Sequence, residues 1–349
     1  MGNALSTSPP TKNRSSRMAG WLTRWWQPCE VAHLVPAVSM LSIFNVVVPI
    51  FALIAAGYLA VRLKAFPQRG VDALVAFVNN FCTPCLLFES MLTSDFRSVF
   101  NLGIIVPFYV GALFSMLVGT IVARRFFRNG IEDAISSGFA AMFTNTLLVG
   151  FPIIQRAYGQ PAMATIFSIV AFHGSILLTS GMVAMELAKR GEAGLGGTLV
   201  VAVRRISVNP LIWGIAGGVT VNLLNLPVPE PATAFLTLMS NAVSPVALFG
   251  IGGALNEYKF SENWLQAAAM NLLKLIIHPL IAWTLMVPIL HVDPHFARYG
   301  VLLAAMPSGI NAYVFATYYN RGTNVAANTL LIGTIASAVT VSAWLAFLG

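Results

Sequence analysis

The chain has 349 residues, of which 57% are hydrophobic and 9% are charged, and its formal net charge is +8. Soluble domains carry about 25% charged residues, so most of this surface cannot face water. Apolar stretches recur from Ile43 to the C-terminus, which excludes a soluble domain on a single membrane anchor. The basic residues lie in short gaps between these stretches and therefore indicate membrane topology rather than binding to nucleic acid.

Residues 1–42 form an N-terminal extension that the apolar pattern does not explain. It is rich in Ser, Thr and Pro at first and then contains Trp21, Trp25 and Trp26. Three interpretations stay open: an interfacial helix, a disordered tail, or a true start of translation at Met40, directly before the first apolar stretch.

The rest of the sequence predicts an all-α integral membrane protein with ten membrane-spanning helices. A bilayer core about 30 Å thick needs roughly 20 apolar residues of helix. The apolar runs are long and continuous, without the alternation of barrel strands, which favours helices. The spans are expected at 43–62, 70–92, 102–123, 135–158, 162–187, 206–224, 231–255, 264–290, 297–320 and 324–348.

Lys and Arg are divided unevenly between the two sets of loops. Twelve lie in or beside the loops that follow the first, third, fifth, seventh and ninth spans, and only Arg97, Arg156 and Arg298 lie in the opposite set. The positive-inside rule places the first set in the cytoplasm and both termini outside. We expect a multi-pass protein of the plasma (inner) membrane.

The two halves of the chain share one pattern. Residues 80–88 and 241–249 both read N-x-x-[ST]-P-x-x-L-F, 161 residues apart, and residues 140–144 resemble 304–308. Halves with an odd number of spans enter the membrane from opposite sides, as in many secondary transporters. We therefore expect a first five-helix repeat at 43–187, a cytoplasmic linker at 188–205 and an inverted second repeat at 206–348.

The fourth and ninth spans contain helix-breaking residues near their centres, at 144–152 and 307–312. Non-helical backbone at this depth persists only where protein buries it or where it lines a wet cavity, and N–H groups at the start of a half-helix bind anions. A simple kink is the alternative, but two breaks at matched positions favour a site. The expected substrate-binding residues are Thr144, Asn145, Thr146, Pro307, Ser308, Gly309 and Asn311.

Other polar residues within the spans are candidates for coupling or support. Asn80 and Asn241 precede matched prolines by four residues, and they either coordinate a cation or substrate or bond to a neighbouring helix. We interpret Glu89 as interfacial, and for His173 we favour a neutral, hydrogen-bonded packing residue over a proton carrier. Lys274 either snorkels or supplies positive charge to a site, and we favour the second role.

Motifs of catalysis and metal binding are weak in this sequence. The pair Cys82 and Cys85 lies in an apolar span rather than in a redox domain, and His291, Asp293 and His295 fall in a short outer loop. We therefore expect no enzymatic activity, no catalytic residues, no metal and no cofactor.

The membrane-spanning part of the sequence resembles the auxin efflux carrier family, which includes plant auxin carriers and many bacterial permeases. The resemblance covers most of 43–348, and its most specific part is Met-Pro-Ser-Gly-Ile-Asn-Ala-Tyr-Val at 306–314. Further matching segments lie at 48–51, 83–88, 209–210 and 244–252.

The resemblance implies a ten-helix inverted repeat, similar to bile acid symporters and sodium–proton antiporters. The fourth and ninth spans would cross at their broken centres beside a site for an organic carboxylate. Pro152 lies well past Asn145, which departs from the proline-centred crossover of plant carriers. The long cytoplasmic loop of some plant members is absent, as in short bacterial permeases, which are linked to dicarboxylates such as malonate.

The expected function is secondary active transport of small organic anions by alternating access, coupled to protons or sodium or driven by the membrane potential. The expected partners are the anion and the lipid bilayer, with a homodimer left open. The alternatives are a channel-like facilitator and a membrane sensor or docking subunit.

Overall fold

The structure is a computed structural model that describes residues 40–93, 101–189, 210–258 and 263–349. The N-terminal extension, Arg97 and residues 190–205 of the predicted linker lie outside these ranges, so the question of a start at Met40 stays open. Within the described ranges, the secondary structure is helical apart from one isolated β-bridge.

Seven helical runs in the described part of the chain are long and apolar enough to cross a membrane, so the protein is an all-helical membrane protein. Short π-helical turns, η2 (Val78–Cys82), η6 (Leu273–Ile277) and η7 (Leu285–Ile289), continue two of these runs. The helices of the seven runs are α2 (Met40–Arg62), α3 (Gln68–Phe77) with α4 (Thr83–Thr93), α6 (Leu102–Arg125), α9 (Met163–Lys189), α12 (Glu230–Ala254), α13 (Trp264–Leu272) with α14 (His278–Thr284), and α17 (Thr323–Leu348).

Three of the ten predicted spans are absent from these seven runs for a physical reason. Helix α11 (Pro210–Leu223) is apolar but has only 14 residues. The other two predicted spans are interrupted, and each of their helical pieces is too short to cross alone. The interrupted segments are α7 (Ile131–Met142) with η3 (Thr146–Gly150) and α8 (Phe151–Tyr158), and α15 (Pro294–Ala304) with α16 (Ile310–Tyr319).

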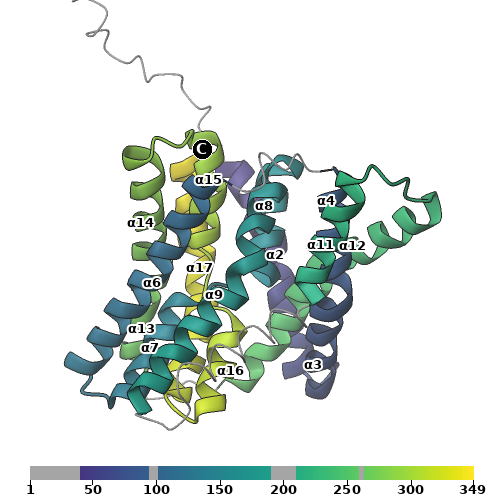
Figure 1. Ribbon diagram of the computed structural model, residues 1–349. Coiled ribbons are helices and arrows are strands. Elements are labelled where there is room, and N and C mark those ends of the chain that lie inside the picture. Colours follow the sequence, from purple (N-terminus) through teal and green to yellow (C-terminus); the bar gives the residue numbers. More distant parts are fainter. Residues whose placement is uncertain (1–39, 94–100, 190–209, 259–262) are drawn as a thin grey trace, which may run out of the picture. The chain divides into compact units, whose positions relative to one another are not determined.

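The helices pack in two groups, each drawn from both halves of the chain (Figure 1). In the first group, α12 packs against α2, α3 and α4, and α11 packs against α4. In the second, α6 packs against α7 and α14, α13 against α17, α14 against α15, and α9 against α7. The interrupted segments belong to the second group.

Two close helix contacts in the first group are related to each other by the 161-residue offset of the repeat. A Cβ atom at Gly57 of α2 would collide with the Phe249 carbonyl oxygen of α12. A Cβ atom at Gly218 of α11 would likewise collide with the Phe88 carbonyl oxygen of α4. The same 161 residues separate Gly57 from Gly218 and Phe88 from Phe249, so the repeat relates both partners of each contact.

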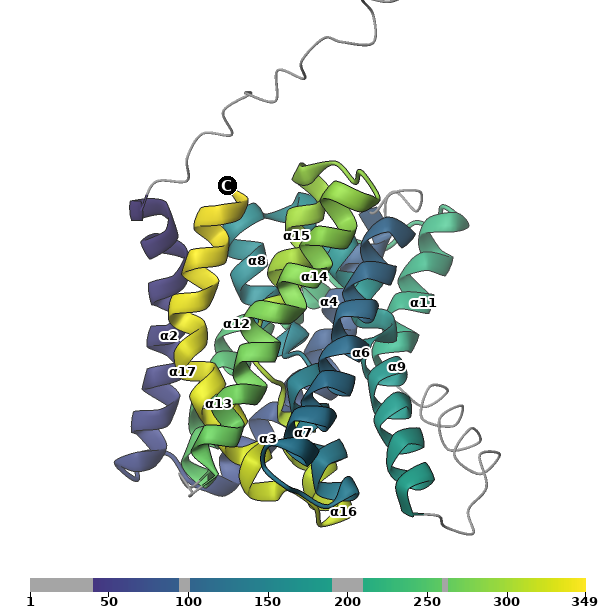
Figure 2. The same ribbon diagram turned by 90° about the vertical axis from the view of Figure 1, so that its left-hand side faces the viewer.

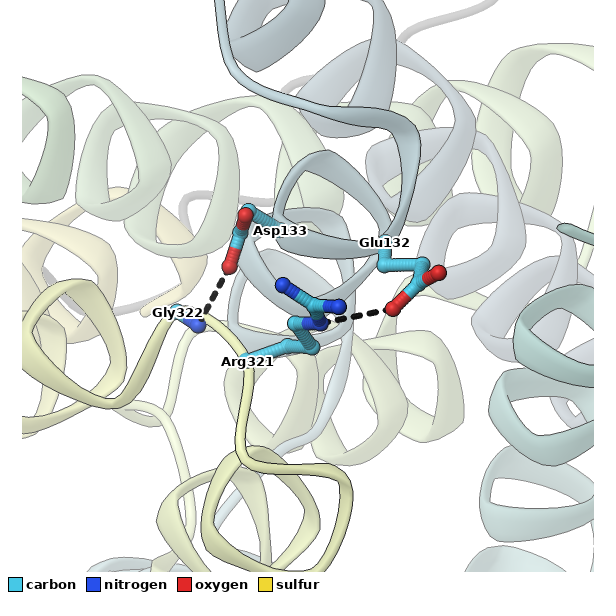
Figure 3. A network of polar contacts seen from close by, with 4 residues as sticks. All are labelled: Glu132, Asp133, Arg321 and Gly322. Carbon is cyan, nitrogen blue, oxygen red and sulfur yellow. Dashed lines mark hydrogen bonds and ion pairs between the residues drawn. The ribbon is translucent and has the colours of Figure 1, made fainter. Parts of the chain in front are cut away.

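Figures 1 and 2 place α3, α7 and α16 toward one end of the bundle and α8 and α15 toward the other. At the first end, Arg321 forms an ion pair with Glu132 (Nε–Oε2, 2.6 Å), and the Gly322 N–H donates to Asp133 (2.9 Å; Figure 3). This end, which we call the basic end, holds most Lys and Arg residues of the described chain. They are Arg62, Lys64, Arg69, Arg124, Arg125, Arg128, Lys189 and Arg321, whereas Arg156 and Arg298 lie toward the other end.

Candidate functional site

The two interrupted segments cross each other through a pair of backbone hydrogen bonds. Thr144 and Ser308 form an isolated antiparallel β-bridge at the crossing. The two bonds run from the Asn145 N–H to the Pro307 carbonyl (2.8 Å) and from the Gly309 N–H to the Phe143 carbonyl (2.9 Å). Backbone N–H and C=O groups that lose their helical partners deep in the protein need other hydrogen-bond partners. Here the two interrupted segments supply these partners to each other. We call residues 143–145 and 307–309 the crossover.

The local sequence explains where the helices stop. In the second half, Pro307 has no N–H to continue α15 and disfavours helical angles at the residue before it. A side chain at Gly309 would press against the Phe143 ring, so a small residue is needed there. In the first half, α7 ends at Met142 and Phe143 adopts an extended conformation. Pro152 instead lies in the first turn of α8, where a missing N–H costs little.

Four helix ends meet at the crossover. Helices α7 and α15 end there, while η3, continued by α8, and α16 start there. The first N–H groups of a helix have no acceptor within it, and the start of a helix carries partial positive charge. The start of α16 at Ile310 therefore offers donors to an anion.

A cavity of about 460 Å³ borders the crossover and separates it from the first helix group. Its volume lies within the range of about 300–1,000 Å³ that is usual for small-molecule sites. The opposite wall comes from α3, η2 and the turn after α12, and includes Asp72, Asn79, Glu257 and Tyr258. Asp72 and Glu257 are exposed and lie toward the basic end, where Gln68 donates to Glu257 (2.9 Å).

Five of the seven predicted substrate-binding residues line this cavity: Thr144, Asn145, Thr146, Gly309 and Asn311. Pro307 and Ser308 lie in the crossover itself instead. Ser308 is fully buried, and its hydroxyl has no hydrogen-bond partner among the described residues. The sequence pattern thus brings all seven to one place, with the cavity along one side.

His173 of α9 also lines the cavity, and it is buried. Its Nε2 lies 3.0 Å from the Thr144 carbonyl oxygen, at the crossover. A carbonyl only accepts, so Nε2 donates. Our interpretation of His173 as a packing residue accounts for its burial but overlooks its position at the cavity wall.

Lys274 lies beside the crossover but outside the cavity wall, and it is fully buried. Its Nζ donates to the carbonyl of Ala304, the last residue of α15 (2.6 Å), and to His278 Nδ1 (3.1 Å). His278 is also fully buried and donates through Nε2 to the Phe108 carbonyl (3.0 Å). The carbonyl end of a helix carries partial negative charge, so the amine of Lys274 stabilises the end of α15 that leads into the crossover.

The structure does not bring the other three predicted support residues to the crossover. The side chains of Asn80 and Asn241 are exposed on the first helix group, away from the cavity wall. Glu89 accepts a hydrogen bond from Thr237 of α12, so it joins two helices of that group. Of the adjacent pair Asn79 and Asn80, it is Asn79 that lines the cavity.

Comparison with known proteins identifies the family. The model of the family described as "Membrane transport protein" matches residues 42–196 and again residues 197–345. The chain belongs to this family. It is the auxin efflux carrier family, so the predicted resemblance is confirmed, and the two matches divide the chain within the predicted linker.

Relatives in this family cover most of the chain. A putative malonate transporter of Rhizobium meliloti is 26% identical over 87% of this chain and 95% of its own length. The uncharacterized transporter YfdV of Escherichia coli is 24% identical over 85% of this chain and 95% of its own. Auxin efflux carrier component 5 of Arabidopsis thaliana is 23% identical over 88% of this chain and 97% of its own length. The chain is thus a multi-pass membrane transporter and not an enzyme.

The cavity wall opposite the crossover was not predicted from the sequence of this auxin efflux carrier family member. Glu257 and Tyr258 lie in the turn after α12, and Asp72 lies in the second turn of α3. Single polar residues are ordinary near the start and end of a membrane-spanning run, so they give no signal. Burial, followed by the nearby carboxylate of Glu257, raises the pKa of Tyr258, so this side chain stays a neutral hydroxyl at the cavity. The repeat pattern singles out Asn80, and it gives no signal for the adjacent Asn79.

Proposed function

We propose that this family member is a secondary active transporter that carries small organic carboxylate anions across the cell membrane by alternating access. The observation that supports this most strongly is the cavity beside the paired breaks. Its wall joins the amides of Asn145 and Asn311 and the hydroxyl of Thr146 with the start of α16. These groups supply N–H and O–H donors, which a carboxylate accepts, and the helix start adds favourable charge.

The class of substrate is inferred from size and from one relative. A cavity of about 460 Å³ accommodates a short dicarboxylate with its water. The relative in Rhizobium meliloti is named a putative malonate transporter. We therefore take malonate as the first substrate to test.

The proposed topology has ten crossings in two inverted halves, 43–187 and 206–348, joined by a cytoplasmic linker at 188–205, with both termini outside. Three observations support it: the double match of the family model, the equivalent contacts of Gly57 and Gly218, and the antiparallel crossover. The accumulation of Lys and Arg at the basic end supports a cytoplasmic position for that end.

Alternating access in this proposal is a movement of the second helix group, with the crossover, against the first. The main cavity lies between them and reaches exposed carboxylates toward the basic end. A smaller cavity of about 280 Å³ lies among α2, α8 and α12, where Arg156 donates to the Asn45 carbonyl (2.9 Å). Opening this contact while the main cavity closes would expose the site to the other side.

The test is counterflow of labelled malonate, citrate, benzoate and glutamate in proteoliposomes that contain the purified protein. A carrier exchanges its substrate and saturates with concentration. Flux that rises linearly would indicate a channel-like facilitator. Absence of exchange for every carboxylate, under any imposed gradient, would contradict the proposal and leave a sensor or docking role.

We expect Asn145→Ala and Asn311→Ala to raise the half-saturating substrate concentration about tenfold each. Loss of one hydrogen bond to a charged group removes about 1.5–3 kcal/mol, and water in the vacated space restores part of it. Asn80→Ala is the matched control, because Asn80 is an exposed asparagine away from the cavity. Wild-type saturation curves in both cavity variants, with folded protein confirmed by gel filtration, would place the site elsewhere.

A further inference from the structure

One side chain that lines the cavity, His173, has a ring nitrogen without a partner in the described part of the protein, Nδ1. The ring is buried, at 4% exposure, and Nδ1 is inaccessible and forms no hydrogen bond to any described residue. Buried polar atoms in native proteins are nearly always paired, so an orphan at a cavity wall calls for an explanation.

The hydrogen bond from Nε2 to the Thr144 carbonyl determines whether Nδ1 is a donor or an acceptor. Because the Thr144 carbonyl accepts the proton on Nε2, a neutral His173 must leave Nδ1 as a bare acceptor. A bare acceptor repels a carboxylate, which is also only an acceptor. The same atom attracts a carboxylate as soon as it binds a proton, since both ring nitrogens of the imidazolium are donors.

We propose that His173 is the proton-coupling residue of this transporter, and that its Nδ1 takes up one proton with each carboxylate anion. The inference rests on the proposed function, which it deepens by naming the coupling ion. Nδ1 is closed off in the conformation described, so the helix movement that admits the substrate must also open the ring to the cavity. A proton from the water on the open side then adds to the Nδ1 lone pair and forms an N–H bond that donates to the substrate carboxylate. On the opposite side the proton leaves Nδ1 for water as the anion departs. No other bond changes.

This arrangement explains why the interior near the site holds bases rather than acids. Phe108 lies between two imidazoles, with ring centroids 5.8 Å from His173 and 5.1 Å from His278, and Lys274 follows next to His278. Both basic groups oppose a positive charge on His173, so a proton stays there only while an anion balances it. Anion and proton therefore bind together, which is the requirement for symport.

Other groups that titrate or carry charge surround His173 from several elements. Tyr109 of α6 lies 6.5 Å away between ring centroids, and its hydroxyl donates to the Ile169 carbonyl. Across the cavity lie the exposed Asp72 and Glu257 and the buried Tyr258, whose ring contacts that of Tyr313 in α16 (4.9 Å between ring centroids). The carboxylates of Asp72 and Glu257 attract protons toward the mouth and disfavour an unaccompanied anion, which again favours entry of the two together.

The experiment uses proteoliposomes with the membrane potential held at zero and an acidic exterior one pH unit below the interior. We expect wild-type protein to accumulate labelled malonate toward about tenfold, because a tenfold proton gradient drives one proton with one anion. We expect His173→Gln to lose this accumulation and to keep only a weaker counterflow of malonate, because the substrate also loses the donor at Nδ1. Glutamine still donates to Thr144 but cannot hold a proton. His295→Gln, at an exposed histidine in the first turn of α15, should accumulate malonate like the wild type.

The outcomes separate this inference from the proposed function. If wild-type protein shows no counterflow, the proposed function fails. If it shows counterflow but no accumulation under the proton gradient, only the coupling fails. Accumulation by His173→Gln equal to that of the wild type would show that the proton travels on the substrate instead. Should the variant fail to fold, a pH dye outside wild-type vesicles still tests the coupling: a constant external pH on adding malonate overturns the inference.

Discussion

Lys274→Met is expected to abolish malonate uptake and to lower the temperature of unfolding. Methionine keeps the length of the side chain but removes its donors, so the Ala304 carbonyl and His278 Nδ1 both lose a partner within fully buried surroundings. Each unsatisfied buried group costs about 1–3 kcal/mol. The end of α15 leads directly into the crossover, so its displacement also moves the N–H groups that face the cavity.

The matched control for this prediction is Lys64→Met, which removes an exposed lysine from the turn after α2. The measurements are gel filtration of heated, detergent-solubilised protein and uptake into proteoliposomes. We expect the control to match the wild type in both. If Lys274→Met kept the unfolding temperature and the uptake of the wild type, the amine would have no role in holding the crossover.

Gly57→Val and Gly218→Val are each expected to prevent accumulation of folded protein. In both cases the new Cβ atom would collide with a carbonyl oxygen of the facing helix, and a backbone atom cannot rotate away as a side chain can. Forcing extra atoms into a close-packed contact costs about 1–3 kcal/mol and sometimes more. Because the repeat relates the two contacts, we expect effects of similar size.

Gly174→Ala provides the control within a helix of the same protein. Apart from the surrounding backbone of α9, no atom of the described residues lies within 4 Å of a Cβ placed at Gly174, so this substitution should be neutral or stabilising, by up to about 1 kcal/mol. The measurement is the yield of monodisperse protein and its unfolding temperature. Normal folding of either valine variant would mean that α2 and α12, or α11 and α4, pack less closely than described.

The crossover was predictable from sequence because its signals are local. Pro307, Gly309 and the polar residues around Asn145 break helices through their own backbone chemistry, and the repeat paired the two breaks. The proline rule alone is insufficient, however. Pro245 lies inside α12 without interrupting it, and Pro152 follows the break rather than making it.

The cavity wall opposite the crossover was not predictable, because a π-helical turn changes which residues lie on a given face of the helix. Turn η2 inserts an irregular step between α3 and α4, so counting residues from the matched proline chose Asn80 when Asn79 lines the cavity. The partners of Lys274 and His173 are backbone carbonyls, of Ala304 and Thr144. A carbonyl is present at every residue, so sequence gives no signal for which one a side chain meets.

The central claim, that the cavity beside the crossover binds the transported anion, is tested most directly by a structure of the protein with its substrate bound. The substrate would be the carboxylate that gives saturable counterflow. Our account predicts ligand density in contact with Asn145 and Asn311 and within hydrogen-bond distance of His173 Nδ1. Density in the smaller cavity beside Arg156, or on the outer surface of the helices with the main cavity empty, would contradict it.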